Sequence, residues 1–205
     1  MVILERMVNS NISAIIKLSK LISVAIALCW LLYFSPSVFQ GNILNGDAAE
    51  SPTTSKFVTY DGSKYGFSIQ HPENWIKKED SSGLWFVSPV DESGNIRIES
   101  QPNQNVSLKE LVQFQLLQSK ESYKNLNIVS SNMTMIDKTP ANRTDYKFKV
   151  EVPKFMGADI YDYDAIKISA LKNDRLYTVT YFAPSDTFYI FLPIVQKMLS
   201  TLKIL

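Results

Sequence analysis

The sequence predicts an α+β domain in which helices pack on an antiparallel β-sheet. Several segments alternate apolar and polar residues with the period of two that is typical of half-buried strands, and two other stretches have helical spacing. The order is strands, helix, strands, helix, without the strict strand-helix alternation of a parallel sheet. An apolar run near the N-terminus predicts that a transmembrane or signal helix precedes this domain.

The apolar run begins with LISVAIALCWLLYF, residues 21–34, which carries no charge and follows Lys17 and Lys20. Basic residues before an apolar run are typical of a secretory signal or a signal-anchor. With the following SPSVF the run reaches Phe39 and spans roughly 19 residues, enough to cross a hydrocarbon core of about 30 Å. We therefore expect residues 21–39 to form a signal-anchor helix.

This topology predicts a single-pass protein of the cell membrane. Residues 1–20 would be a short cytoplasmic N-terminus, and the C-terminal domain would be extracellular. No convincing cleavage site follows the helix, although small residues surround Ala48 and Ala49. Secretion after signal cleavage is the alternative, because the strictly uncharged stretch before Pro36 is only about 14 to 15 residues long.

Residues 40–56, QGNILNGDAAESPTTSK, are predicted to be a disordered linker because they contain little to bury. The remaining residues, 57–205, number about 150 and suit a single core. The balance of 21 basic and 20 acidic residues argues against nucleic-acid binding, which needs a basic face. A single cysteine, Cys29, excludes an intrachain disulfide and a cysteine-based metal cluster.

The predicted strands begin with FSIQH, in which Phe67, Ile69 and His71 share one face. In YKFKVEV, residues 146–152, the aromatic and aliphatic side chains face one way, and two lysines and a glutamate face the other. The same alternation occurs in LWFVS, IRIES and AIKISAL. Turns are predicted at DGSKYG, DSSG, DESGN and KNDR.

Two helices are predicted. In SLKELVQFQLLQSKESY, Ser107 and Glu110 have the spacing of a capping box. The apolar stripe of this helix, near 107–122, consists of Leu108, Leu111, Val112 and Leu116, widened by Phe114 and Leu117. Near the C-terminus, a short helical turn over 186–191 is expected to precede a helix that begins at Pro193 and ends near Thr201, since proline suits a first helical turn.

Three segments resemble the PsbP-like family. YDGSKYGFSIQHPENW, residues 60–75, is similar to that family's entry hairpin, in which the pattern Y-G-F-x-I-x-Y/H-P-x-x-W begins the domain. FYIFLPIVQKMLSTLKI, residues 188–204, resembles its closing helix, and TPANRTDYKF, residues 139–148, resembles its central strand pair. The pattern is formed here by Tyr65, Gly66, Phe67, Pro72 and Trp75.

The resemblance implies an α-β-α sandwich of the Mog1/PsbP type. Its best-known members are extrinsic subunits of photosystem II, and the domain also occurs on membrane-anchored extracellular proteins of archaea and bacteria, the group that this chain resembles. It implies a non-enzymatic binding or assembly module with an unidentified protein partner at the cell surface. Plant members have been associated with metals through histidines and carboxylates, but the only histidine, His71, lies inside the hairpin pattern, so we expect neither a histidine metal site nor a cofactor.

The hairpin pattern has a structural interpretation. Gly66 allows a tight backbone after the turn, Pro72 ends a strand, and Trp75 is expected to fold over the core. His71 has no serine or cysteine nucleophile near it in sequence, so no catalytic residue is assigned.

The alternative is a metal-dependent or hydrolytic extracellular enzyme. GADIYDYDAIK contains Asp159, Asp162 and Asp164, whose oxygens could bind a cation such as calcium, with His71 as a further catalytic group. The spacing does not match an EF-hand loop, and in a strand Asp159 would face away from the other two. These aspartates are therefore weak metal candidates.

Sequons for N-glycosylation offer the last candidate sites. Asn105, Asn132 and Asn142 begin N-x-S/T triplets in the domain expected outside the cell, near predicted loops or strand edges. Such triplets also arise by chance in a chain rich in asparagine and serine.

Overall fold

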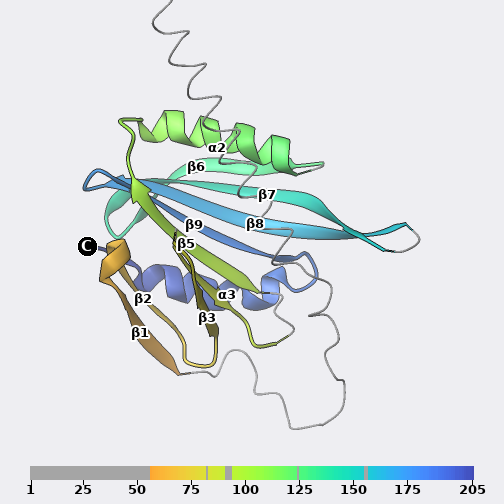
Figure 1. Cartoon of the computed structure of the whole chain (residues 1–205), viewed down its shortest axis with the longest axis horizontal. Helices are drawn as coiled ribbons and strands as arrows, with labels where there is room; N and C mark the ends of the chain where they lie inside the picture. Colours follow the sequence, from red (N-terminus) through yellow and green to blue (C-terminus); the bar gives the residue numbers. More distant parts are fainter. Residues whose placement is uncertain (1–55, 82, 91–93, 124, 155–156) are drawn as a thin grey trace, which may run out of the picture. The chain divides into compact units, whose positions relative to one another are not determined.

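A computed structural model describes residues 56–81, 83–90, 94–123, 125–154 and 157–205 (Figure 1). The predicted cytoplasmic segment 1–20, the signal-anchor 21–39 and nearly all of the linker 40–56 lie outside these residues. Within the described ranges, none of the helices combines the length and the apolar character that a membrane span requires.

The main layer is an antiparallel sheet of seven strands. Their spatial order is β3 (Ile76–Glu79), β4 (Gly83–Val87), β5 (Asn95–Pro102), β9 (Arg175–Pro184), β8 (Ala158–Lys172), β7 (Thr139–Pro153) and β6 (Asn127–Ile136). The chain builds one half of the sheet as the meander β3-β4-β5, crosses to the far edge, and returns through β6, β7, β8 and β9 to pair with β5. The predicted antiparallel sheet is confirmed.

A second, three-stranded sheet contains the segment that resembles the entry hairpin. Its order is β1 (Phe57–Gly62), β2 (Phe67–Pro72) and β10 (Lys203–Ile204). A single 3-10 turn, η2 (Ser63–Tyr65), joins the first two strands, and Gly66 ends the turn in the left-handed region at φ 80°. The last residues of the domain thus pair with its entry hairpin.

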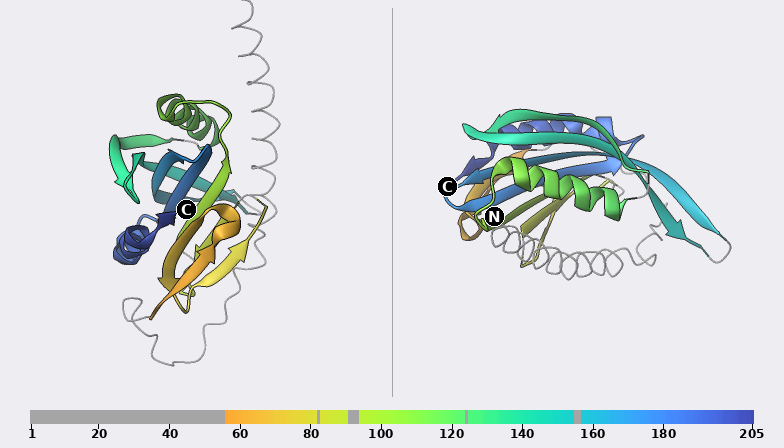
Figure 2. Two further views of the ribbon diagram at one scale, coloured as in Figure 1. Left: turned by 90° about the vertical axis from the view of Figure 1, so that its left-hand side faces the viewer. Right: turned by 90° about the horizontal axis from the view of Figure 1, so that it is seen from above.

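The helices lie on opposite faces of the seven-stranded sheet (Figures 1 and 2). Helix α2 (Leu108–Ser122) packs against β7 and β8, and α3 (Phe188–Thr201) packs against β9 and β2. We call the two faces of the large sheet the α2 side and the α3 side. One helix on each face of an antiparallel sheet forms the predicted α-β-α arrangement.

Helix α2 begins as predicted. The Ser107 hydroxyl accepts a hydrogen bond from the Glu110 backbone N–H, and the Glu110 carboxylate accepts one from the Ser107 N–H. Of the predicted apolar stripe, Leu111 is buried, whereas Phe114 and Leu117 are 38% and 62% exposed. The apolar face of α2 is wider than its contact with the sheet, so Phe114 and Leu117 at the margin of that face remain in contact with solvent.

Helix α3 differs from its prediction. It runs unbroken from Phe188 to Thr201 with Pro193 inside, rather than as a short turn followed by a helix that begins at Pro193. Phe188 and Phe191 are buried in the core, whereas the two residues between them in the sequence, 189 and 190, are exposed. Burial of these two rings holds the first turn in helical geometry, although the proline removes the hydrogen bond to the carbonyl of residue 189 and its ring crowds that carbonyl.

The hydrophobic core fills the α3 side. It joins the small sheet, the inward residues of the large sheet and the buried face of α3. Side chains that are 0 to 2% exposed include Phe67, Ile69, Leu84, Phe86, Ile96, Ile98, Val179, Tyr181, Val195 and Met198. The predicted faces of FSIQH, LWFVS and IRIES are confirmed by this list.

Strands β7 and β8 extend beyond both of their neighbours. The β6–β7 pairing ends at Asn127 and Lys147, and the β8–β9 pairing ends at Tyr163 and Pro184. Beyond Lys147 on β7 and before Tyr163 on β8, the two strands pair only with each other among the described residues. This part projects as a two-stranded arm (Figure 1). We call residues 148–154 and 157–162 the arm.

Candidate functional site

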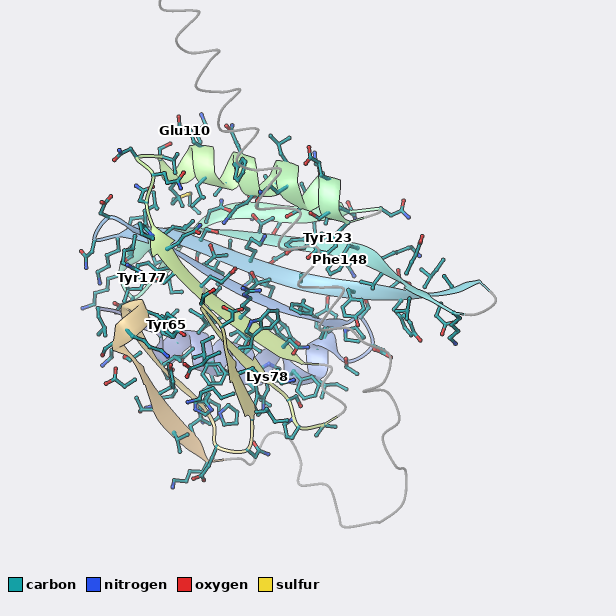
Figure 3. The ribbon with its side chains drawn as sticks, in the orientation of Figure 1. Tyr65, Lys78, Glu110, Tyr123, Phe148 and Tyr177 are labelled. Atoms are coloured by element: carbon teal, nitrogen blue, oxygen red, sulfur yellow. The ribbon has the colours of Figure 1, made fainter. Side chains whose placement is uncertain are left out.

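The hairpin pattern packs into the core. Trp75 is 5% exposed and meets Phe191 edge to face at 6.2 Å, so its predicted burial is confirmed. Gly66 lies against Tyr177: a Cβ atom on Gly66 would come within 2.7 Å of the Tyr177 hydroxyl oxygen. Tyr65 and Tyr177 both appear in Figure 3, at the end of the molecule opposite the arm. The pattern therefore specifies a packed corner.

His71 has a structural environment. Its ring lies 4.4 Å from that of Phe86, and its Nδ1 lies 2.8 Å from the carbonyl oxygen of Pro72. Since a carbonyl can only accept a hydrogen bond, Nδ1 carries the proton. Burial lowers the pKa of His71 below its usual value of 6.5, which favours the neutral ring. These contacts favour a role in packing.

The three aspartates form ion pairs along the hairpin of β7 and β8. Asp162 pairs with Lys149 at 3.2 Å, Asp164 pairs with Lys147 at 3.0 Å, and Asp159 pairs with Lys154. Asp162 and Asp164 lie on the α3 side, as the register shows, whereas Asp159 lies on the other face. A cation would have to displace three ammonium groups to bind them.

The aspartates also do not converge with His71. They belong to β8, whereas His71 belongs to β2 of the small sheet. Within the described part of the chain, no set of three or more His, Cys, Asp or Glu side chains is placed to hold a metal ion. The geometry gives the enzyme alternative no support.

The three sequons occupy different settings. Asn105 is exposed in the loop before α2, with φ 59°, and Asn132 is exposed on β6. Asn142 is half-buried on β7, where its side-chain oxygen accepts hydrogen bonds from the hydroxyls of Ser131 and Thr144. Glycosylation at these sites stays a prediction, and Asn105 and Asn132 are the more accessible acceptors.

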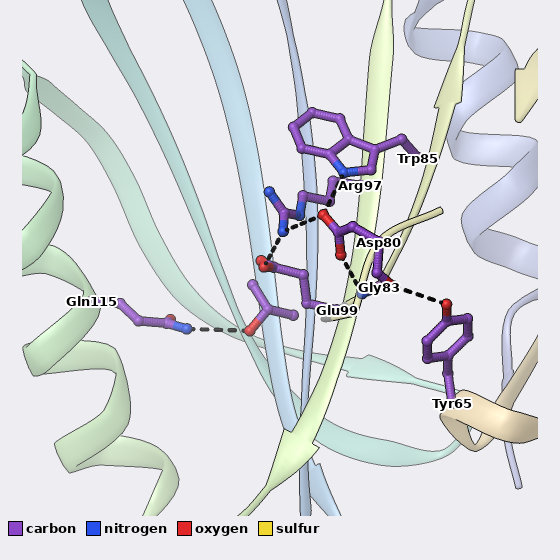
Figure 4. A network of polar contacts seen from close by, with 8 residues as sticks. Tyr65, Asp80, Gly83, Trp85, Arg97, Glu99 and Gln115 are labelled. Atoms are coloured by element: carbon purple, nitrogen blue, oxygen red, sulfur yellow. Dashed lines mark hydrogen bonds and ion pairs between the residues drawn. The ribbon is translucent and has the colours of Figure 1, made fainter. Parts of the chain in front are cut away.

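The structure reveals a polar network on the α2 side that we did not predict (Figure 4). Arg97 on β5 pairs with Glu99 at 2.9 Å and with Asp80 at 3.3 Å, and its guanidinium lies 4.4 Å from the centre of the Trp85 ring. Asp80 also accepts hydrogen bonds from the indole N–H of Trp85 and the backbone N–H of Gly83. The Arg97 side chain is only 18% exposed, so these contacts fix its position.

Strands β9 and β8 extend this polar face toward α2. The register of the sheet places Thr178 beside Glu99 and Lys167 beside Thr180. Gln115 of α2 donates a hydrogen bond to the Thr178 hydroxyl at 3.2 Å and accepts one from Ser169 at 2.7 Å. The helix is therefore joined to the sheet partly through polar contacts.

Burial shifts two charged groups of this face toward neutrality. Burial raises the pKa of Glu99 above its usual range, and the positive charges of Arg97 and Lys167 only partly offset that effect. Burial likewise lowers the pKa of Lys167, and Glu99 opposes that shift. Lys167 contributes to the wall of a small cavity under α2, together with Val112, Gln115, Leu116, Ser119, Thr144 and Tyr146.

A row of aromatic rings borders the polar network and leads to the arm. Trp85 meets Phe182 at 6.3 Å, Phe182 meets Tyr163 at 6.4 Å, and Tyr163 meets Phe148 at 5.6 Å. Tyr123, at the C-terminal end of α2, covers Phe148 at 4.2 Å, and Figure 3 labels this pair. The same face of the arm continues with Val150, Val152 and Tyr161. We call this row together with the Arg97 network the recognition surface.

This surface combines charged and aromatic side chains. Its charges lie beside opposite charges, and its rings Trp85, Tyr123 and Tyr163 are partly exposed, whereas Phe148 and Phe182 are buried. It contains no histidine or cysteine: His71 lies in the small sheet, and Cys29 lies outside the described residues. The alternation in LWFVS and IRIES places Trp85, Arg97 and Glu99 on the outward face, but only the strand pairing brings Trp85 opposite Arg97.

The sandwich has the PsbP/Mog1-like fold. Among solved structures, the chain resembles cyanobacterial PsbP (CyanoP) from Synechocystis sp. PCC 6803, with a TM-score of 0.53, 11% sequence identity, and 81% of this chain and 99% of that chain covered. It also resembles the Ran-binding protein Mog1p of Saccharomyces cerevisiae, with a TM-score of 0.52, 10% identity, and 74% and 96% covered.

A third similar structure is LpqN of Mycobacterium tuberculosis, which is involved in cell envelope biogenesis. Its TM-score is 0.50 at 9% identity, and the alignment covers 72% of this chain and 90% of that one. No protein-family model and no curated protein sequence matches the chain. At these identities the likeness establishes the fold alone.

Proposed function

We propose that residues 57–205 form a non-enzymatic, protein-binding module outside the cell, which residues 21–39 tether to the membrane. The observation that carries this proposal is the recognition surface. It combines a nearly buried arginine, held in place by two carboxylates and an indole ring, with a row of aromatic rings that leads onto a projecting arm. Aromatic residues and arginine are the types most enriched at the energetic centres of protein interfaces.

The arm gives this surface its reach. Its α2-side face carries Val150, Val152 and Tyr161 together with Asp159, and its opposite face carries the Lys149–Asp162 pair and the exposed Ile160. The apolar and aromatic side chains that lie together on the α2-side face are expected to contact a partner there. Tyr161 is 42% exposed, so its ring is available for such contact.

The solved structures of similar fold favour a binding role. Mog1p is described as a Ran-binding protein, and LpqN as involved in cell envelope biogenesis. We transfer neither Ran nor any envelope component to this chain. What Mog1p supports is the use of this fold as a module that binds another protein.

The test compares two tyrosines on opposite sides of the sheet. The full-length protein, in its native membrane, would be cross-linked to its neighbours as wild type, as Tyr161→Ala and as Tyr189→Ala. Tyr189 is 65% exposed on α3, so it is a control of the same chemistry away from the recognition surface. We expect Tyr161→Ala to lose a partner that wild type and Tyr189→Ala retain. A partner recovered equally from all three would contradict this surface.

The tether is tested separately. If residues 21–39 anchor the protein, the chain keeps its N-terminus and sediments with membranes through high-salt and carbonate washing. A soluble form that begins near Ala49 or Glu50 would contradict the anchor. That outcome would leave the proposed binding role of the domain intact.

A further inference from the structure

The two edges of the seven-stranded sheet are built differently. At one edge, β3 has four residues, IKKE, of which three are charged. At the other edge, β6 has ten residues, NIVSSNMTMI, with no charge and no proline. Natural sheets protect their edges with short strands, charges, prolines or bulges, because an unpaired edge can bind another strand. By this criterion β3 is protected, whereas β6 is unprotected from Ser130 to Ile136, beyond its one register shift.

Strand β6 also exposes large apolar side chains. Val129, Met133 and Met135 are 57%, 67% and 60% exposed. A register shift between Ile128 and Ser130 disturbs the first part of the strand, but the pairing with β7 is regular from Ser130 to Ile136. In the described residues, β7 is the only strand that pairs with β6. A regular, uncharged edge with two exposed methionines is suited to receive a further strand.

We propose that β6 pairs antiparallel with β6 of a second copy of this chain, so that the two sheets join across a two-fold axis at Thr134. A second copy fits because an uncharged strand meets itself without placing like charges opposite each other. This self-association is independent of the recognition surface, to which β6 does not contribute.

The symmetry limits the register. A two-fold axis between antiparallel strands stands perpendicular to the sheet, so both copies keep their α2 sides on the same face. Residues directly opposite each other must then come from the same face. With the axis at Thr134, Met133 lies opposite Met135 of the second copy, and Met135 lies opposite its Met133. Both exposed methionines are thus buried against each other.

The other face of β6, which carries Thr134 and Asn132, is also compatible with pairing about this two-fold axis. Thr134 lies opposite Thr134 of the second copy, a favourable cross-strand pair. Asn132 lies opposite Ile136 of the second copy. A glycan on Asn132 would occupy the same edge, so glycosylation there and this pairing exclude each other.

The test is a pair of cysteine variants of the full-length protein in detergent, each in a Cys29→Ser background. Directly opposite residues have Cα atoms about 4.5–5.5 Å apart, within the disulfide range of about 4.4–6.8 Å. Thr134→Cys should therefore form a covalent dimer on mild oxidation. Asn132→Cys should not, because its two copies would lie about 13 Å apart along the strands. Both substitutions remove the same sequon, so they are matched in that respect.

A second measurement keeps the proposal falsifiable without disulfide chemistry. Met133→Lys should raise the concentration for half-dimerisation by about tenfold or more in sedimentation, while Leu117→Lys, on the exposed edge of α2, should leave it unchanged. A wild-type protein that stays monomeric, cross-linking as efficient at position 132 as at 134, or a glycan found on Asn132 of the native protein would each overturn the proposal.

Discussion

The two sides of the large sheet are made by the same strands but carry different chemistry. On β4 and β5, Phe86 and Ile98 point to the α3 side and are fully buried in an apolar core. Their neighbours Trp85, Arg97 and Glu99 point to the α2 side and form a network of ion pairs and hydrogen bonds. Alternation along a single strand thus separates an apolar core from a polar network.

This difference predicts that the two sides contribute unequally to stability. Burial of apolar surface contributes about 25 cal/mol per Å², whereas partly exposed ion pairs contribute about 0–1 kcal/mol each. We therefore expect substitutions on the α3 side to affect unfolding, and matched substitutions on the α2 side to affect binding.

The largest expected effect is that of Trp75→Ala. Truncation of a buried tryptophan leaves a cavity and costs about 3 kcal/mol or more, and Trp75 is 5% exposed in the core, where it meets Phe191 of α3. The free energy of unfolding, measured from the urea midpoint, should fall by this amount. An unchanged midpoint would contradict the placement of Trp75 in the core.

Trp85→Ala is the matched control on the α2 side. The Trp85 ring is half-buried and lies against Arg97, so part of its surface is already in contact with solvent or polar groups. We expect a smaller loss of unfolding free energy than for Trp75→Ala. Equal losses of unfolding free energy in the two variants would mean that the α2 side contributes as much to stability as the α3 side.

An intermediate effect is expected at Gly66. An alanine at φ 80° costs about 1–2 kcal/mol for the left-handed backbone, and its Cβ would meet the Tyr177 hydroxyl oxygen at 2.7 Å. That hydroxyl is buried and has no hydrogen-bond partner among the described residues. Gly66→Ala should therefore lower the thermal midpoint, and Tyr177→Phe should restore part of the loss by removing the obstructing oxygen.

The double variant separates the two causes. If the steric contact matters, Gly66→Ala with Tyr177→Phe should be more stable than Gly66→Ala alone, while Tyr177→Phe alone stays close to wild type. If the double variant gains nothing, the whole cost comes from the backbone conformation.

Local patterns in the sequence predicted most of the fold. Period-two alternation identified the faces of the strands, the Ser107–Glu110 box identified the start of α2, and the hairpin pattern placed Trp75 in the core. The extent of α3 was predicted wrongly, because the local rule for Pro193 was overridden by the burial of Phe188 and Phe191.

The recognition surface was not predicted because it depends on strand order. Trp85 and Arg97 meet through β4–β5 pairing, and Glu99 and Lys167 approach each other only because β9 lies between β5 and β8. No local pattern records these pairings. The aspartates were considered as weak metal candidates for the same reason, since the lysine partners of Asp162 and Asp164 are on the adjacent strand β7 and the partner of Asp159 directly follows it.

The smallest expected effect is a difference in pH dependence between the two sides. His71, on the α3 side, has a pKa lowered by burial, so the unfolded chain binds a proton more readily than the folded one. Protonation of His71 therefore lowers the free energy of unfolding as the pH falls below 6.5. Glu99, on the α2 side, has a pKa raised by burial, so its contribution has the opposite sign: stability is lost as the pH rises above 4.5.

The variants His71→Tyr and Glu99→Gln distinguish these contributions. Tyrosine keeps a ring against Phe86 but does not titrate in this range, so His71→Tyr should remove the loss of unfolding free energy below pH 6.5. Glu99→Gln should leave that loss in place and steepen it, because the opposing contribution of the carboxyl is gone. The effect of Glu99 should be the smaller one, since its side chain is 35% exposed and solvent screens its charge. Urea unfolding at several pH values between 4.5 and 6.5 measures both slopes. A slope unchanged in His71→Tyr would contradict the burial of a neutral histidine on the α3 side.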